Sequence, residues 1–147
     1  QGVSSAASDV YKRQILDSHL SLSGQERIFE SKETIHIFYD KKHTVPWKKA
    51  NVYFHPVAQG LDLVEVMSQI GQLGYHDLWL EAGPRLMASM HEKNLVQKTH
   101  IFCTPHVLGP QGLDAFAVKQ AYFNRPFVLQ SEQMGDNILA TFIWREH

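Results

Sequence analysis

The feature that most limits the fold of this chain is the alternation of short β-rich runs with a stretch of helical period. Three β-rich runs come first, at residues 15–17, 34–40 and 51–56. Apolar residues then recur at helical spacing, which predicts an amphipathic helix over 62–73. Strands that alternate with helices of this length favour βαβ units and a largely parallel sheet. We therefore expect a single α/β domain.

The ends of this first helix carry their own signals. Asp62 stands where an N-cap is expected, and Glu65 follows three residues later, so that the pair approximates a capping box. Gly74 is suited to the left-handed position just after the helix.

The segment DLWLEAGPRLMASMHEKNLV, residues 77–96, predicts a strand that turns sharply into a helix. Residues 77–80 are interpreted as a strand, and 84–93 as a helix that stops at Asn94. A further strand is expected at 99–104. Tight strand-to-helix junctions at the carboxyl ends of strands are where open α/β sheets bind ligands.

The last part of the chain has β-rich runs with no helical pattern between them. Two β-rich runs, 125–133 and 137–146, surround a turn at 134–136, which indicates an antiparallel hairpin. A hairpin after parallel strands implies a mixed, mostly parallel sheet.

Composition excludes several classes of partner and site. The net charge of −1 gives no footprint for nucleic acid, and no apolar run approaches the roughly 20 residues that span a bilayer. The basic loop 41–49 is short and is interpreted as solvated. A single cysteine, Cys103, fits a reducing cytoplasm. No metal site is expected, because His100 and Cys103 would point to opposite faces of one strand.

Residues 1–14 are interpreted as a non-native leader that resembles a translated adaptor sequence; a native flexible linker is the alternative. The usable domain then covers 15–147, and we expect it to be a piece of a longer protein.

Four motifs, in this order and spacing, resemble one family. They are ILDSHLSLS, the EAGPRL of residues 81–86, the NLVQK of 94–98 and the PHVLG of 105–109. Together they are similar to the carboxyl-terminal reductase domain of the bifunctional riboflavin-biosynthesis deaminase/reductase. The resemblance covers about residues 15–147. Ala82 departs from it mildly, since glycine is common there.

The resemblance implies a dihydrofolate-reductase-like, three-layer α/β fold and a homodimer. It also implies NADPH-dependent reduction of 5-amino-6-(5-phosphoribosylamino)uracil, a small-molecule substrate, to its ribitylamino product. The family's upstream strand and zinc deaminase half have no counterpart in these residues. We therefore expect the segment by itself to be inactive. Two alternatives stay open: a non-catalytic nucleotide-binding or dimerisation module, or a reductase of another pyrimidine or pterin-like compound.

By the same resemblance, Glu81 contacts substrate and the loop from Gly83 to Ser89 binds the cofactor. The members of this loop are Gly83, Pro84, Arg85, Leu86, Met87, Ala88 and Ser89. Glycine permits close backbone approach, proline suits a first helical position, and a helix N-terminus attracts anions. The alternative is a purely structural role, as a tight turn with a solvated glutamate.

Ser18 is a further candidate, because the corresponding serine of the family borders the cofactor. Its alternative role is only to begin a turn together with Asp17, as such residues often do.

Overall fold

The structure is a computed structural model that describes residues 12–58, 60–114 and 125–145. The chain divides into two compact units, Gln1–His76 and Asp77–His147, and each unit is described by itself. Within the described residues, no helix has the length and apolar character that a membrane crossing requires.

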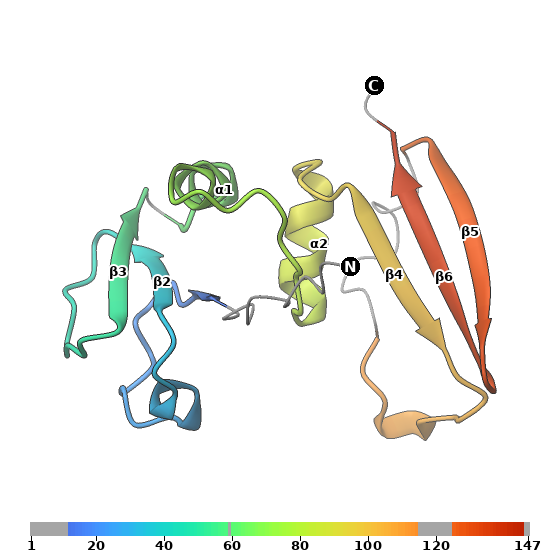
Figure 1. Ribbon diagram of the computed structural model, residues 1–147, viewed down its shortest axis with the longest axis horizontal. Helices are drawn as coiled ribbons and strands as arrows, with labels where there is room; N and C mark the ends of the chain where they lie inside the picture. Colours follow the sequence, from blue (N-terminus) through green and yellow to red (C-terminus); the bar gives the residue numbers. More distant parts are fainter. Residues whose placement is uncertain (1–11, 59, 115–124, 146–147) are drawn as a thin grey trace, which may run out of the picture. The chain divides into compact units, whose positions relative to one another are not determined.

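The first unit contains a parallel sheet of three strands (Figure 1). The strands are β1 (Arg13–Leu16), β2 (Ile35–Asp40) and β3 (Val52–Val57), in the order β1-β2-β3. The predicted parallel pairing is confirmed. β1 and β2 are joined through a short 3-10 helix (Arg27–Glu30), and β2 and β3 through the basic loop 41–49.

Two apolar clusters pack on opposite faces of this sheet. On one face, Phe29 of the 3-10 helix joins Ile35, Ile37 and Val52, and Trp47 of the loop packs against them. Side chains of the 3-10 helix and of the loop therefore cover this face. On the other face lies the cluster formed by Phe38, Val57, Val66 and Ile70. Its last two residues belong to helix α1 (Leu63–Gln72), so α1 covers that face.

The predicted ends of α1 are confirmed, but the capping box is not. The Asp62 carboxylate accepts a hydrogen bond from the Val64 N–H at 2.9 Å. Gly74 adopts φ +87°, as a residue just past the helix requires. Glu65 instead accepts from the Ala58 N–H at 2.8 Å, and this bond ties the end of β3 to the helix.

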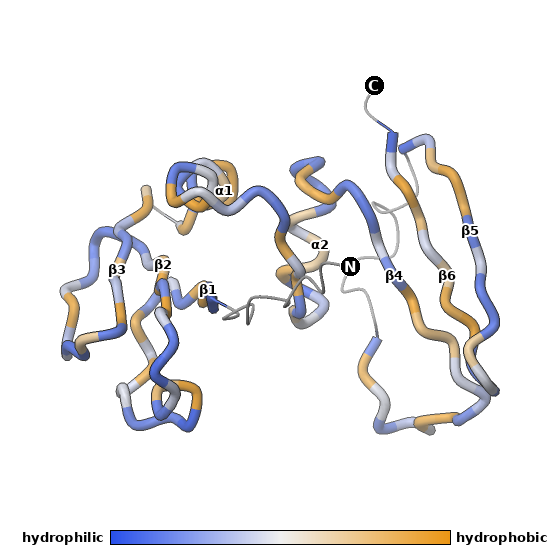
Figure 2. Tube along the Cα trace, in the orientation of Figure 1, coloured by the Kyte–Doolittle hydropathy of each residue, from blue (hydrophilic) through white to orange (hydrophobic). Residues whose placement is uncertain are grey.

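The second unit contains helix α2 (Pro84–Glu92) and an antiparallel sheet in the order β4-β6-β5. Its strands are β4 (Lys98–Cys103), β5 (Phe127–Met134) and β6 (Asn137–Trp144), with a 3-10 helix at Gly109–Gln111. The hairpin is confirmed, with Met134 paired to Asn137 across a two-residue turn. Figure 2 shows β4 changing from hydrophilic at its start to hydrophobic at its end.

The strand predicted at 77–80 is wrong: residues 75–83 form neither helix nor strand. A strand needs a neighbour for its backbone N–H and C=O groups, and none of the described strands pairs with this segment. Leu78 and Trp79 are 39% and 68% exposed. The apolar residues at 77–80 therefore do not belong to a sheet in this structure.

Candidate functional site

The N-terminus of α2 is an uncapped helix end. Gly83 is its N-cap residue, Pro84 stands in the first turn, and no side chain caps the helix. The first intrahelical bond runs from the Met87 N–H to the Gly83 carbonyl at 3.1 Å. The first turn carries no acidic residue, and Arg85 adds a positive charge. The amides of Arg85 and Leu86 therefore lie where a helix end attracts an anion.

The N-terminus of α1 is built in the opposite way. Its cap residue Asp62 uses a carboxylate to satisfy the amide of Val64, and Glu65 adds a second negative charge to the first turn. An anion would be repelled there. Of the two α-helices in the described ranges, only α2 therefore begins in a way that suits a phosphate.

Gly83 leaves open space in front of this turn. A Cβ atom placed on Gly83 would meet nothing within 4 Å. Its backbone, at φ −68° and ψ 168°, is an ordinary extended conformation that any residue can adopt. The glycine is therefore not required by the local backbone, and what it provides is room for an approaching group.

The rest of the predicted cofactor loop divides by burial. Ala88 is 4% exposed and faces the core, whereas Leu86, Met87 and Ser89 are half-buried. Ser89 also contributes its carbonyl to the helix end, where it accepts from the Lys93 N–H at 3.2 Å. A ligand on this loop would therefore meet backbone of the first turn before it met these side chains.

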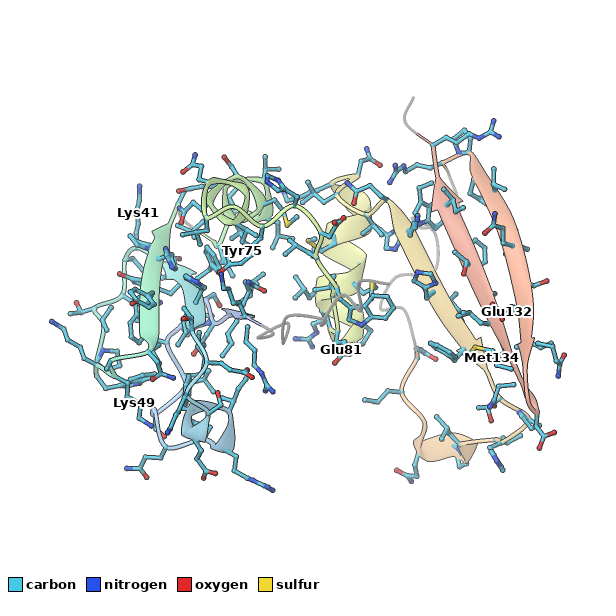
Figure 3. All side chains as sticks on the ribbon, in the orientation of Figure 1. Lys41, Lys49, Tyr75, Glu81, Glu132 and Met134 are labelled. Atoms are coloured by element: carbon cyan, nitrogen blue, oxygen red, sulfur yellow. The ribbon has the colours of Figure 1, made fainter. Side chains whose placement is uncertain are left out.

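Glu81 lies in the exposed segment that leads into α2 (Figure 3). One of its carboxylate oxygens accepts a hydrogen bond from the Trp79 indole N–H at 3.2 Å. The Trp79 ring stacks on His100 of β4, with 5.3 Å between ring centroids. A carboxylate has acceptor capacity beyond one hydrogen bond. The Trp79 N–H thus limits the orientation of the Glu81 carboxylate and leaves acceptor capacity on it, an arrangement that the sequence analysis did not predict.

Ser18 lies in the first unit, in the turn after β1. Its hydroxyl contacts His19 Nδ1 at 2.8 Å, and its carbonyl accepts from the Asp40 N–H at 3.1 Å. The neighbouring Asp17 shapes this turn by accepting from the Ser21 hydroxyl and the Leu22 N–H. Burial by itself would raise the pKa of Asp17, but these hydrogen bonds outweigh it and lower the pKa.

Asp40 holds three loops together at the carboxyl end of the parallel sheet. Its carboxylate accepts from the backbone N–H groups of Lys42 and Gly60, each at 3.1 Å, while its own N–H holds the Ser18 carbonyl. The Lys42 ammonium lies 3.1 Å from the same carboxylate. The hydrogen bonds from Lys42 and Gly60 lower the pKa of Asp40 to about 2. Its partners in the fold gave no signal in the sequence.

The basic loop and the histidine-cysteine pair form no further site here. Lys41 and Lys49 lie at opposite ends of β3 (Figure 3), so the loop does not gather its charge in one patch. His100 contacts the Thr141 hydroxyl at 3.0 Å, and Cys103 is exposed. In the part of the chain that the structure describes, no three His, Cys, Asp or Glu residues are grouped to hold a metal ion.

Comparison with known proteins gives a consistent family. The model of the RibD C-terminal domain matches residues 3–125. The riboflavin biosynthesis protein RibD of Escherichia coli K12 is 37% identical over 49 residues, which are 33% of this chain and 13% of the E. coli protein.

Solved structures agree in fold. Acinetobacter baumannii RibD (form 1) has a TM-score of 0.69 at 21% identity, covering 91% of this chain and 37% of that one. A diaminohydroxyphosphoribosylaminopyrimidine deaminase/5-amino-6-(5-phosphoribosylamino)uracil reductase from Thermotoga maritima has a TM-score of 0.75 at 17% identity, covering 91% and 38%. The chain spans well under two thirds of the length of these relatives. The expected dihydrofolate-reductase-like α/β fold class is confirmed. A single mixed, mostly parallel sheet was expected, whereas the described strands form one parallel and one antiparallel sheet of three strands each.

The family model covers most of the chain and includes the EAGPRL segment of residues 81–86. The resemblance inferred from the sequence motifs is thus confirmed: this chain belongs to the RibD C-terminal domain family.

Proposed function

We propose that the protein containing this chain is an NADPH-dependent oxidoreductase. Its proposed reaction is the reduction of 5-amino-6-(5-phosphoribosylamino)uracil to the ribitylamino product in riboflavin biosynthesis. The observation that carries the proposal is the open, uncapped N-terminus of α2 directly after Glu81. Family membership and the reductase activity named for the T. maritima relative support it.

The first turn of α2 is the proposed phosphate site. The amides of Arg85 and Leu86, together with the helix dipole, favour a pyrophosphate in front of Gly83. Arg85 contributes a guanidinium that suits phosphate geometry. Ser18 is also proposed as a polar contact to the cofactor, on the family resemblance alone.

Glu81 is the proposed substrate contact. When bound, the nicotinamide would supply the hydride, and the protein would supply binding and orientation. The Glu81 carboxylate, held by the Trp79 N–H, can accept hydrogen bonds from amino or hydroxyl groups of the substrate. This role fixes the position of the substrate and requires no proton transfer by the side chain.

Replacing Glu81 with glutamine is expected to lower kcat/KM for the pyrimidine substrate about fivefold, or about 1 kcal/mol. Glutamine keeps one carbonyl acceptor but loses the charge that strengthens the bond. The dissociation constant for NADPH should stay within twofold. Steady-state NADPH oxidation and NADPH fluorescence titration of the full-length protein measure the two quantities.

The matched control is Glu30→Gln, since Glu30 is an exposed glutamate at the end of the 3-10 helix Arg27–Glu30. This variant should behave as wild type in both assays. Equal kcat/KM values for wild type and Glu81→Gln would rule out the substrate role. Failure of the wild-type protein to bind NADPH would rule out the proposed function.

We also propose that the full-length protein is a cytoplasmic homodimer. The apolar FIW run of residues 142–144 lies on β6, which is paired on both sides. The edge strand β5 is exposed along its whole length and is the better candidate. Sedimentation at micromolar concentration should give a dimer, and a clean monomer would contradict this proposal.

A further inference from the structure

A chain of three polar side chains is buried in the second unit, outside the site described above. His91 of α2, Thr99 of β4 and Trp144 of β6 are 4%, 8% and 7% exposed. The Trp144 indole N–H donates to the Thr99 hydroxyl oxygen at 2.9 Å. The same oxygen lies 3.1 Å from His91 Nε2. The His91 and Trp144 rings also meet edge to face, with centroids 5.2 Å apart.

The chemistry of these groups fixes which atom donates and which accepts in each hydrogen bond. An indole N–H is a donor only, so the Thr99 oxygen must accept from Trp144. The Thr99 hydroxyl hydrogen can then be donated to His91 Nε2, which requires that nitrogen to be unprotonated. Burial, together with the nearby Arg125 charge, lowers the pKa of His91. A neutral imidazole at neutral pH fits this arrangement.

These hydrogen bonds join the helix of the proposed phosphate site to two strands, β4 and β6, of its three-stranded sheet. Ala88 and Met90 also bury α2, but apolar contacts are non-directional and tolerate small shifts. Hydrogen bonds fix distance and angle, so they select one rotation and one height of the helix. His91 and Arg85 belong to the same nine-residue helix, about 9 Å apart along its axis at 1.5 Å per residue.

We propose that His91, Thr99 and Trp144 are positioning residues that anchor α2 and thereby fix the backbone amides of its first turn for the cofactor phosphates. They act through the helix and touch neither cofactor nor substrate. The cofactor step of this inference rests on the proposed function, whereas the anchoring of α2 does not.

The test compares Thr99→Val with Thr99→Ser in the full-length protein. Valine keeps the branched shape but removes the hydroxyl that links Trp144 to His91, whereas serine keeps the hydroxyl. Amide hydrogen exchange should become at least about fivefold faster in α2 of Thr99→Val, while exchange in β2 and β3 stays unchanged. The dissociation constant for NADPH should rise about fivefold, with kcat at saturating NADPH within twofold. Thr99→Ser should resemble wild type in all three measurements.

The outcomes separate the anchor from the proposed function. If wild type binds no NADPH, the proposed function fails, and the exchange comparison still decides whether the chain anchors α2. Unchanged exchange in α2 of folded Thr99→Val would overturn the anchor. Faster exchange with unchanged NADPH affinity would overturn its link to the cofactor. If Thr99→Val does not fold, Trp144→Phe, which removes the donor but keeps an aromatic ring, must give the faster exchange in α2.

Discussion

Truncation of Phe38 to alanine is expected to lower the free energy of unfolding by about 3–5 kcal/mol. Phe38 is fully buried on the α1 face of the parallel sheet, where it packs with Val57, Val66 and Ile70. Its ring also stacks on His55, with centroids 4.9 Å apart. Removal of the ring leaves a cavity between the sheet and α1 in addition to the lost burial. Since domains are typically stable by 5–15 kcal/mol, this loss is large.

Urea unfolding of the full-length protein, followed by circular dichroism, measures this effect. Val64→Ala is the control, because Val64 is 52% exposed on the outer side of α1, and it should change the free energy by at most about 0.5 kcal/mol. Phe38→Leu should fall between the two. A loss below about 1 kcal/mol in Phe38→Ala would mean that this cluster is not a tightly packed core.

Local signals predicted the helices of this chain well. The start of α1 at Asp62 and its end at Gly74 depend on capping and on φ, which are set by residues within one turn. The hairpin between β5 and β6 was found for a similar reason, because its turn at Gly135 and Asp136 is short. The parallel strands were also found, since their apolar runs are compact.

Contacts between residues that are distant in the sequence could not be predicted from it. Residues 77–80 have the composition of a strand, but a strand depends on neighbours that composition does not identify. Glu65 had the spacing of a capping box, yet Ala58 offered it another donor. In each case the presence or absence of a tertiary contact decided between two options that looked equal in the sequence.

The candidate site shows the same division. EAGP was found because glycine and proline mark a helix start within four residues. Asp40 and the hydrogen-bonded residues His91, Thr99 and Trp144 were missed. Thr99 lies 8 positions from His91 and 45 positions from Trp144 in the sequence. A buried polar residue becomes interpretable only when its hydrogen-bond partner is known.

Gly83→Val tests the central claim about this site, and the structure makes it a clean test. The extended backbone of Gly83 suits a β-branched residue, including one that precedes proline. A Cβ atom at this position would have no contact within 4 Å outside the adjoining residues. The fold should therefore be retained, and the circular dichroism spectrum should match that of wild type. The valine methyl groups would instead occupy the space in front of the first turn of α2.

We therefore expect Gly83→Val to raise the dissociation constant for NADPH about tenfold or more, equivalent to about 1.4 kcal/mol. NADPH fluorescence titration of the full-length protein measures it. Gly71→Ala is the matched control, because Gly71 is a glycine in α1 that also has open space around it, and its NADPH affinity should equal that of wild type. If folded Gly83→Val binds NADPH as tightly as wild type, the phosphates do not approach this turn, and EAGP serves only to connect the chain to α2.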